Sequence, residues 1–397
     1  MSYKKLLVLL FFVYYQPILA NNIEQALTDY LDNYHKKTPL NCSILVAQNN
    51  KIIYMNGFGF ANKENGIKNT EQTQHLIGSL TKVFTAAAVL KLVEQGQLKL
   101  TNTVAYYLPE NHELWQGKMP KWANTVTIHH LLTHTAGLAE YVTLEEFEKF
   151  YEKPHTTHEL VRFFAYAPVK FNAGESYEYS GSGYNLLGAL IEIVSGKSYS
   201  TFLEEEFFKP LNMLNTYSPH TMMLSQVQKI NPALSTGYVV EEEKLVPAGE
   251  VNLTTAFAEA SIISTVIDLW RWQEALYNGK VLKTNTLEAM LTPYQQISDS
   301  DTWVGYGIFI DKAADGKIIY EHTGRINGYD SIMLYDPTTK TSVIMLSNVM
   351  DGTAFAVAYT LLDIAQETSS NLCYGILLFI SMALLPFCLT IFYLKRG

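Results

Sequence analysis

The pattern of hydrophobic and polar positions changes twice along the chain. Strand-like alternation appears at residues 43–48 and 52–55, and it returns between about residues 302 and 347. Between about residues 79 and 290, most segments instead repeat their apolar positions every three or four residues, which is typical of amphipathic helices. We therefore expect one antiparallel sheet built from both ends of the chain, with a helical region inserted at about residues 95–290.

The same patterns predict the individual elements. A first amphipathic helix is expected at residues 22–36, and a turn at Asn49–Lys51 is expected to join the first two strands. In the middle of the chain, helices are expected at residues 80–94, 128–134, 158–166, 184–194 and 266–276. The later elements are four strands and a final helix, at residues 304–310, 317–322, 331–335, 342–346 and 353–366. A cleft between sheet and insertion is where a ligand site is expected.

The first 20 residues have the pattern of a secretory signal peptide. Lys4 and Lys5 precede an apolar run, and Ala20 offers a small residue for cleavage. An uncleaved anchor is the alternative.

A second apolar run lies at residues 372–394 and contains no charged residue over 23 positions. As a helix it would be about 34 Å long, enough to cross a hydrocarbon core of about 30 Å; a buried core helix is the alternative. The basic tail at 395–397 is expected in the cytoplasm. We therefore expect a single-pass cell-membrane protein whose domain at 21–367, joined by a linker at 368–371, lies on the extracytoplasmic side.

Composition and charge exclude several classes of protein. Of the 397 residues, 48% are hydrophobic, 13% aromatic and only 17% charged, which excludes a disordered chain. A net charge of −9 argues against nucleic-acid binding, which needs a basic patch or stripe. Three cysteines, two of them in the last apolar run, cannot build a disulfide scaffold.

The segment from Gly78 to Lys82 opens the predicted helix at 80–94. Residues three apart share a helix face, so the Lys82 amine is expected to reach the Ser79 hydroxyl. A partly desolvated lysine can accept the serine proton and so activate this hydroxyl as a nucleophile. Free amides at the helix start could face a developing oxyanion. On this segment alone, a helix N-cap is the alternative role of Ser79.

A loop rich in glycine and serine at residues 174–184 contains Tyr179. A tyrosine held near a lysine ionises more easily and can act as a general acid or base. Ordinary loop packing is the alternative for at least one of the three tyrosines of this loop, Tyr177, Tyr179 and Tyr184.

A third segment, His322 to Arg325, lies at the end of a predicted strand. Its small residues, Thr323 and Gly324, would let a substrate backbone lie along the strand, and the amide of Arg325 could complete an oxyanion hole with that of Ser79. On its own, His322 fits equally well a strand-end histidine with a local hydrogen bond.

Taken in order, these segments resemble the class C β-lactamase-related branch of the serine β-lactamase and penicillin-binding-protein-like hydrolases. Such proteins carry Ser-x-x-Lys and a later Lys-Thr-Gly, and in this branch a Tyr-x-Asn triplet lies between the two. Segments that resemble further family landmarks are Phe84–Ala88, Leu92–Gly96, Ile128–Leu138, Gly183–Gly188 and Pro210–Met213. The resemblance covers about residues 25–365 and implies a β-lactamase/transpeptidase-like α+β fold, in which an all-helical domain adjoins the sheet and the serine lies at their junction.

The resemblance also implies roles for individual residues. Ser79 would be the acylated nucleophile, Lys82 its proton acceptor and Tyr179 the proton shuttle to the leaving group and later from water. His322 takes the place of the lysine in the third motif, a substitution common among the esterases and peptidases of the family. Thr323, Gly324 and Arg325 would bind substrate and stabilise the oxyanion.

Two departures from the family pattern bear on the substrate. Gly181 stands where the middle triplet normally has asparagine, so the amide that would hold a substrate carbonyl is missing; this puts hydrolysis of peptides and β-lactams in doubt more than that of esters. The segment Ala258–Ser261 stands where the family usually has a Gly-Gly pair, which can reshape the cleft wall.

We therefore expect a membrane-tethered serine hydrolase that forms an acyl-enzyme on Ser79 and acts on peptides containing D-amino acids, as a D-Ala-D-Ala carboxypeptidase, D-aminopeptidase or β-lactamase-like enzyme does. A carboxylesterase and a catalytically silent binding or assembly module are the alternatives. Neither a cofactor nor a metal is expected: His130 and His134 are four residues apart, but Leu131 stands where the zincin signature has glutamate. The oligomeric state is left open.

Overall fold

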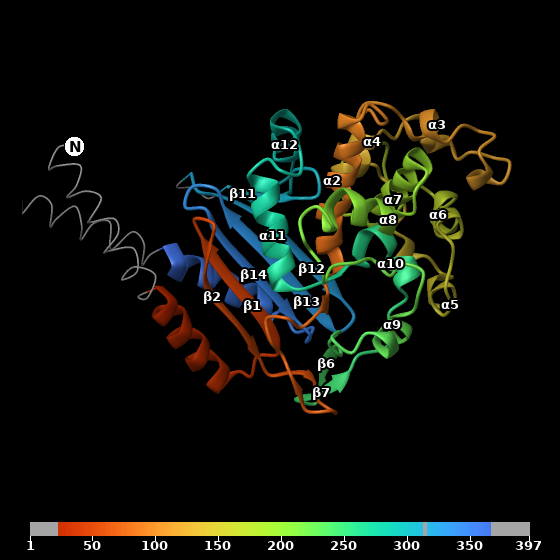
Figure 1. The fold of residues 1–397 in the computed structure, drawn as a ribbon. Helices are drawn as coiled ribbons and strands as arrows, with labels where there is room; N and C mark the ends of the chain where they lie inside the picture. Colours follow the sequence, from red (N-terminus) through yellow and green to blue (C-terminus); the bar gives the residue numbers. More distant parts are fainter. Residues whose placement is uncertain (1–22, 313–315, 367–397) are drawn as a thin grey trace, which may run out of the picture.

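The computed structural model describes residues 23–312 and 316–366 of the chain. Within these residues, the largest sheet has eight antiparallel strands in the order β2-β1-β14-β13-β12-β11-β10-β9 (Figure 1). The strands are β1 (Cys42–Gln48), β2 (Lys51–Phe58), β9 (Gln295–Gln296), β10 (Thr302–Val304), β11 (Phe309–Lys312), β12 (Ile318–Ile326), β13 (Tyr329–Asp336) and β14 (Thr341–Ser347). Strand β1 pairs with β14 from Cys42–Ser347 to Gln48–Thr341. The prediction that both ends of the chain build one sheet is confirmed.

Both faces of the central strands are buried. In β1, the side chains of Ile44 and Val46 pack with the helices at residues 23–37 and 353–366, whereas Leu45 joins the core shared with α11 (Val266–Tyr277) and the other helices. Strands β13 and β14 are buried at every position. Helices therefore cover both faces of this antiparallel sheet. The α+β arrangement expected from the sequence is therefore confirmed.

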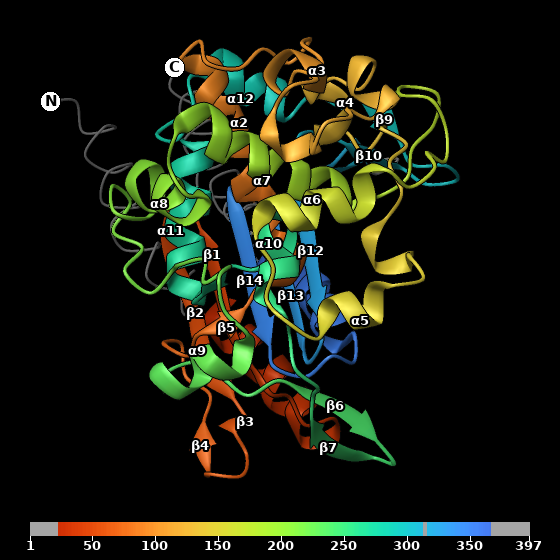
Figure 2. The ribbon, with the colours of Figure 1, turned by 90° about the vertical axis from the view of Figure 1, so that its right-hand side faces the viewer.

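Most of the remaining helices gather beside the sheet and form a second part of the molecule (Figure 2). They are α2 (Thr81–Glu94), α3 (Val104–Tyr107), α4 (Ile128–Leu132), α5 (Phe147–Tyr151), α6 (Thr157–Ala165), α7 (Gly181–Ser195), α8 (Tyr199–Leu203), α9 (Leu224–Ile230), α10 (Leu253–Ala260) and α12 (Thr284–Met290). Helices α2 and α7 lie at the centre of this part and are largely buried on all sides.

Short strand pairs lie outside the large sheet. They are β3 (Phe60–Asn62) with β4 (Ile67–Lys68), β5 (His75–Leu76) with β8 (Ile263–Ser264), and β6 (Tyr238–Glu241) with β7 (Lys244–Pro247). The β5–β8 pair carries the largest consequence, because it brings the start of α2 next to the end of α10. Residues of both helices therefore reach the same place although they are far apart in the sequence.

Two predicted elements differ from the structure. The helix predicted at 128–134 ends at Leu132, because His134 has φ +58°, a left-handed conformation that a helix cannot contain. The strand predicted at 304–310 is divided into β10 and β11 by a turn that includes Gly307, with φ +68°. A Cβ at Gly307 would lie 2.7 Å from the carbonyl oxygen of Lys82, so the turn is where the sheet touches α2.

The predicted signal peptide at 1–20, the linker at 368–371, the apolar run at 372–394 and the tail at 395–397 lie outside the described residues. Among the helices at 23–312 and 316–366, none has the length and apolar character needed to cross a bilayer.

Candidate active site

Ser79 lies in η1 (Gly78–Leu80), a 3-10 turn between β5 and α2. Gly78 has φ +53°, and a Cβ there would lie 3.0 Å from the backbone nitrogen of Arg325 on β12. A Cβ at Gly324 would lie only 2.1 Å from the carbonyl oxygen of Ile77. Because both positions are glycine, the turn that carries Ser79 rests directly on the backbone of β12. The structure thus brings together Ser79, Gly324 and Arg325, as the sequence predicted.

Lys82 lies one helical turn from Ser79, with its side chain fully buried. Its Nζ donates hydrogen bonds to Ser79 Oγ at 3.0 Å, to Glu259 Oε2 at 2.5 Å and to the backbone oxygen of Glu259 at 3.1 Å. Burial alone would lower the pKa of Lys82, but the Glu259 carboxylate and the Tyr179 hydroxyl outweigh burial and raise it. Lys82 is therefore a cation at neutral pH and donates to Ser79.

Tyr179 lies just before α7, with its ring facing Lys82: Nζ is 4.8 Å from the ring centroid. The packing around the hydroxyl raises the pKa of Tyr179 although 36% of the residue is exposed, and the Lys82 cation works against this rise. The ring stacks on His134, with 4.5 Å between the centroids, and His134 Nδ1 accepts a hydrogen bond from the backbone nitrogen of Ser180 at 3.0 Å. His134 thus holds both Tyr179 and the residue after it.

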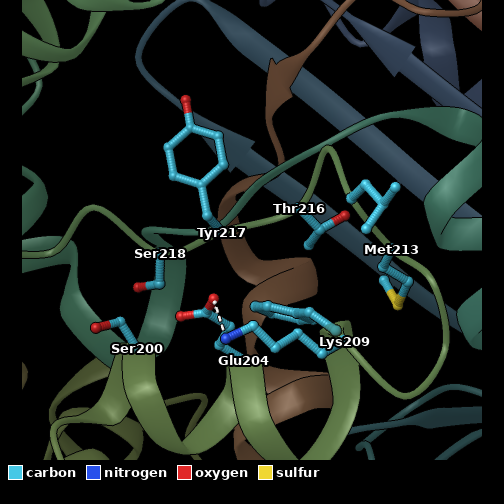
Figure 3. Close-up of a pocket in the computed structure, with 9 residues that line it drawn as sticks. Ser200, Glu204, Lys209, Met213, Thr216, Tyr217 and Ser218 are labelled. Atoms are coloured by element: carbon cyan, nitrogen blue, oxygen red, sulfur yellow. Dashed lines mark ion pairs between the residues drawn. The ribbon is translucent and has the colours of Figure 1, made fainter.

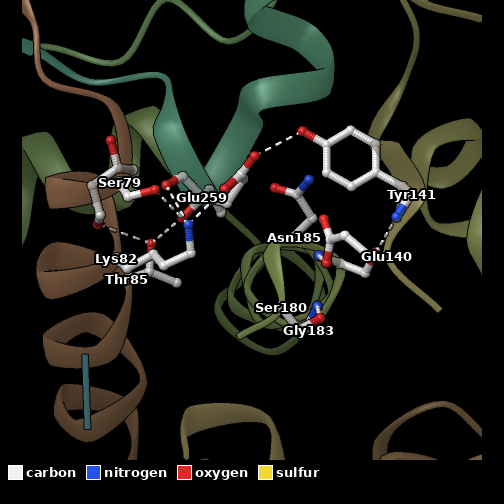
Figure 4. A network of polar contacts seen from close by, with 12 residues as sticks. Ser79, Lys82, Thr85, Glu140, Tyr141, Ser180, Gly183, Asn185 and Glu259 are labelled. Atoms are coloured by element: carbon white, nitrogen blue, oxygen red, sulfur yellow. Dashed lines mark hydrogen bonds and ion pairs between the residues drawn. The ribbon is translucent and has the colours of Figure 1, made fainter. Parts of the chain in front are cut away.

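The other side of the site carries two carboxyl groups, from Glu140 and Glu259. Figure 4 shows the chain of polar contacts that runs from Ser79 through Lys82 and Glu259 to Tyr141, whose hydroxyl donates to Glu259 Oε1 at 2.7 Å. Glu140 Oε2 accepts from the backbone nitrogen of Ser182 at 3.2 Å. Burial and the neighbouring Glu259 raise the pKa of Glu140 to about 7.

His322 is buried on β12 and electrically neutral. Burial, together with the nearby Lys82 cation, lowers its pKa to about 3. Its Nδ1 lies 2.6 Å from the carbonyl oxygen of Thr323, so this nitrogen carries the proton. Within the described part of the chain, Nε2 has no hydrogen-bond partner. The position that holds lysine in the family's third motif therefore presents a neutral acceptor.

The Arg325 side chain is engaged by a buried carboxylate. Its Nε and Nη2 donate to the two oxygens of Asp330 at 2.7 and 3.0 Å, and Asp330 also accepts from the backbone nitrogen of Gly352. The guanidinium is thus held in a two-pronged ion pair, and what Arg325 offers to the region around Ser79 is its backbone.

The two histidines considered for a metal serve separate purposes. His130 forms a capping box with Thr127 at the start of α4, whereas His134 supports Tyr179. In the ranges that the structure describes, no group of three or more His, Cys, Asp or Glu side chains could hold a metal ion.

A pocket of about 290 Å³ lies elsewhere, between α8 and the segment at 213–218 (Figure 3). Glu204 and Lys209 form an ion pair of 3.0 Å at its wall. None of the residues discussed above lines this pocket, so it takes no part in the chemistry around Ser79.

Sequence reasoning missed three residues that the structure brings to the site: His134, Glu140 and Glu259. His134 was noted only within a family-like segment and as a doubtful metal ligand, and nothing in the sequence marked Glu140. For Glu259 there was a signal, because the segment Ala258–Ser261 departs from the family pattern, but that departure was interpreted as a change of shape and not of charge.

Comparison with known proteins agrees with this geometry. Residues 27–367 match the family described as Beta-lactamase. The chain belongs to the Beta-lactamase family. A putative penicillin-binding protein, PbpX of Bacillus subtilis, is 26% identical over 322 residues, which are 81% of this chain and 74% of that protein.

Solved structures of this family share the fold. An octameric penicillin-binding protein homologue from Pyrococcus abyssi superposes with a TM-score of 0.74 at 27% identity, covering 86% of this chain and 77% of the other. A D-amino acid amidase from Ochrobactrum anthropi superposes with a TM-score of 0.72 at 24% identity, covering 88% and 99%. The chain is thus a serine hydrolase of the Beta-lactamase family with a β-lactamase/transpeptidase-like α+β fold.

Proposed function

We propose that the protein hydrolyses esters and amides through an acyl-enzyme on Ser79. The observation that carries this proposal is the 3.0 Å contact between Lys82 Nζ and Ser79 Oγ, beside the ring of Tyr179 and the backbone of Arg325. Nucleophile, proton-transfer groups and backbone amides within reach of one another are what acyl transfer requires. This arrangement also argues against a catalytically silent module.

In the proposed reaction, Ser79 Oγ attacks the carbonyl carbon of the substrate as its proton leaves through Lys82, and the carbonyl π electrons move onto the oxygen. The backbone amides of Ser79 and Arg325 stabilise this oxyanion. The tetrahedral intermediate collapses as the leaving group departs with a proton from Tyr179. Water then attacks the ester carbon of acyl-Ser79 and gives one proton to Tyr179, and Ser79 recovers its own proton through Lys82 as the acid product leaves.

The charges around the site favour substrates without a free carboxylate near the scissile bond. Lys82 is paired with Glu259, Arg325 is paired with Asp330, and His322 is neutral. A substrate carboxylate would therefore meet Glu259 without an unpaired cation from these three residues. Neutral esters and amides avoid this repulsion, so they are the first substrate class that we propose.

Peptides containing D-amino acids are the second candidate class. Supporting this class are the descriptions of related proteins, namely the putative penicillin-binding protein of B. subtilis and the D-amino acid amidase of O. anthropi. The missing amide at Gly181 makes such peptides the weaker candidates.

The test uses the full chain, purified in detergent, beside its Ser79→Ala variant. After incubation with a fluorophosphonate, we expect intact mass spectrometry to find one adduct on the natural protein and none on the variant. Rates on a short nitrophenyl ester, a D-amino acid amide, a D-Ala-D-Ala peptide and a penicillin then rank the substrate classes. Loss of Ser79 should lower the ester rate at least about 1,000-fold. A folded protein that takes up no reagent and turns over no substrate would contradict the proposal and favour a binding module.

We further propose that the domain works at the extracytoplasmic side of the cell membrane, tethered by residues 372–394. Support comes from the signal-like pattern at 1–20, the apolar run and the basic tail after it. Under alkaline carbonate extraction, the full chain should remain with the membranes, and a chain ending at residue 367 should be released. Release of the full chain would contradict the tether.

A further inference from the structure

Glu259 makes closer contact with Lys82 than Ser79 does. Its Oε2 lies 2.5 Å from Lys82 Nζ and its Oε1 accepts from the Tyr141 hydroxyl at 2.7 Å, so both carboxylate oxygens have partners. The Glu259 side chain is only 15% exposed. A carboxylate this deep is stable there because a buried lysine and a buried tyrosine hydroxyl receive it.

The backbone of α10 delivers Glu259 to this position. Phe257, inside α10, has φ +28°, which breaks the regular helix two residues before Glu259. After the break, the carbonyl oxygens of Ala258 and Glu259 accept hydrogen bonds from Thr85 and Lys82 on α2. A strained conformation at a bulky residue persists only where surrounding contacts impose it. The kink therefore turns the chain so that both the backbone and the side chain of Glu259 contact Lys82.

Gly181 provides the space that the Glu259 carboxyl group occupies. A Cβ at residue 181 would lie 2.9 Å from Glu259 Cδ and 2.8 Å from Glu140 Oε1. An asparagine, as in the family's middle triplet, would put its whole side chain into this volume. The position of the Glu259 carboxyl group beside the nucleophile therefore depends on the absence of a side chain at residue 181.

The positive charge of Lys82 conflicts with its expected role as acceptor of the serine proton. An ammonium group that donates to Ser79 Oγ cannot also accept the serine proton. If Lys82 passes one of its protons to the Glu259 carboxylate, the amine becomes free to accept. Two hydrogen bonds in series, from Ser79 to Lys82 and from Lys82 to Glu259, provide the path (Figure 4).

We propose that Glu259 is a positioning residue for the reaction of Ser79, which acts through Lys82 as the final acceptor of the serine proton, and that Gly181 is the residue that makes room for it. This inference rests on the proposed function.

The proton transfers balance as follows. One proton moves from Lys82 Nζ to Glu259 Oε2, which leaves a neutral amine and a neutral carboxylic acid. As Ser79 Oγ forms its bond to the carbonyl carbon, the serine proton moves to Lys82 Nζ, and the lysine is a cation again. Net, one proton has moved from serine to Glu259, and the oxyanion carries the negative charge. The leaving group takes its proton from Tyr179, which water later restores, and Glu259 returns its proton to Ser79 Oγ through Lys82 when acyl-Ser79 is hydrolysed.

Several titratable groups face Glu259 from the elements packed around it. They are Lys82 on α2, Tyr179 before α7, and Glu140 and Tyr141 at η4 (Tyr141–Thr143). His134 and His322 add no charge at neutral pH, because burial lowers the pKa of both.

The decisive variant is Glu259→Gln, which keeps the shape of the side chain but cannot accept the proton. At neutral pH, we expect kcat on a neutral ester to fall about 100-fold or more, while KM changes little. In this variant, burial still lowers the pKa of Lys82 but the carboxylate no longer raises it. Lys82 can therefore lose its proton directly in alkaline solution, so the activity of the variant should recover between about pH 7 and 10.

The matched control is Glu204→Gln, which removes a carboxylate from the Glu204–Lys209 ion pair at the pocket of Figure 3. Its rate and pH profile should equal those of the natural protein. A role of Glu259 in folding alone would give a loss of activity that does not depend on pH.

Two further variants keep the test decisive if Glu259→Gln folds poorly. Glu259→Ala should regain activity several-fold when formate is added, because formate restores a carboxylate beside Lys82. Gly181→Asn should be nearly inactive alone, since its side chain collides with Glu259, and Gly181→Asn/Glu259→Ala should be more active than Gly181→Asn.

The variants distinguish a failure of the role of Glu259 from a failure of the proposed function. If Ser79→Ala abolishes the reaction but Glu259→Gln keeps the natural rate and pH profile, the role of Glu259 is wrong and the proposed function stands. Loss in Glu259→Gln without alkaline recovery, together with no formate rescue of Glu259→Ala, also overturns that role. A natural protein that no fluorophosphonate labels overturns the function and the inference together.

Discussion

Two walls of the site around Ser79 are built in different ways. On the first, η1 lies against β12, and the contact is backbone against backbone through Gly78 and Gly324. On the second, α7 and α10 leave a space at Gly181 that the carboxyl groups of two glutamates fill. The first wall fixes where the nucleophile stands, and the second sets the protons and charges around it.

This difference shows which part of the site can vary. The first wall is a contact between backbone atoms, which cannot rotate away as the end of a side chain can. A side chain added at Gly78 or Gly324 would therefore displace the turn that carries Ser79. Carboxyl groups can be exchanged for neutral groups of the same shape, so the second wall can change its chemistry while Ser79 stays in place. The departures from the family pattern at Gly181 and Glu259 both lie on this second wall.

The largest effect is expected from Gly324→Ala, which acts on the first wall. The new Cβ would lie 2.1 Å from the carbonyl oxygen of Ile77, so the turn carrying Ser79 must shift. We expect the free energy of unfolding to fall by about 2–3 kcal/mol and kcat/KM on an ester to fall at least about 100-fold. Thermal unfolding and steady-state kinetics measure the two quantities.

The comparison is sharpened by Gly181→Ala. The atoms nearest its Cβ belong to the ends of two glutamate side chains and not to the backbone, so small side-chain shifts relieve the contact and we expect a loss of only about 1 kcal/mol. The exposed Gly249→Ala serves as the control and should change the stability by less than about 0.5 kcal/mol. Equal losses for Gly324→Ala and Gly181→Ala would mean that the two walls are equally rigid.

The sequence predicts the contact between Ser79 and Lys82 better than it predicts the second wall. The contact between Ser79 and Lys82 follows from a three-residue spacing at a helix start, which is a local relation. The contact between Lys82 and Glu259 joins residues 177 positions apart and depends on the β5–β8 pair and on the kink at Phe257. The hydrophobic periodicity of the sequence does not predict such a kink, because tertiary packing imposes it. For the same reason, the sequence predicts a helix through His134, where the backbone is left-handed.

An effect that depends on pH is expected from Glu140→Gln, which changes a charge on the second wall. The pKa of Glu140 in the folded protein, about 7, lies above its ordinary value of 4.5. Its contribution to stability is therefore fully present below about pH 4.5 and is lost as the pH rises through 7. Across this range, the natural protein should lose up to about 3 kcal/mol that Glu140→Gln does not lose. Chemical denaturation at pH 4.5, 6 and 8 measures the difference.

Glu321→Gln is the matched control for Glu140→Gln. Burial also raises the pKa of Glu321 to about 7, but this carboxyl group contacts Tyr359 and not the second wall. Both variants should flatten the dependence of stability on pH, whereas only Glu140→Gln should change the dependence of ester hydrolysis on pH. If Glu321→Gln changed the activity profile as strongly, charge near Ser79 would not be a property of the second wall.

A moderate effect on placement alone is expected from His134→Asn, which acts on the support of the second wall and leaves its charges unchanged. Asparagine adopts the φ of +58° found here with little strain, so the backbone itself should remain unaffected. The stack on Tyr179 and the acceptor for the Ser180 amide are lost, however. An unsatisfied buried amide and a lost aromatic pair should together cost about 1–2 kcal/mol.

Because Tyr179 is then less well placed, kcat should fall about 10-fold with KM nearly unchanged. The pH profile should keep its natural shape, since His134 is neutral. A shifted profile would show that His134 also takes part in the proton transfers around Lys82.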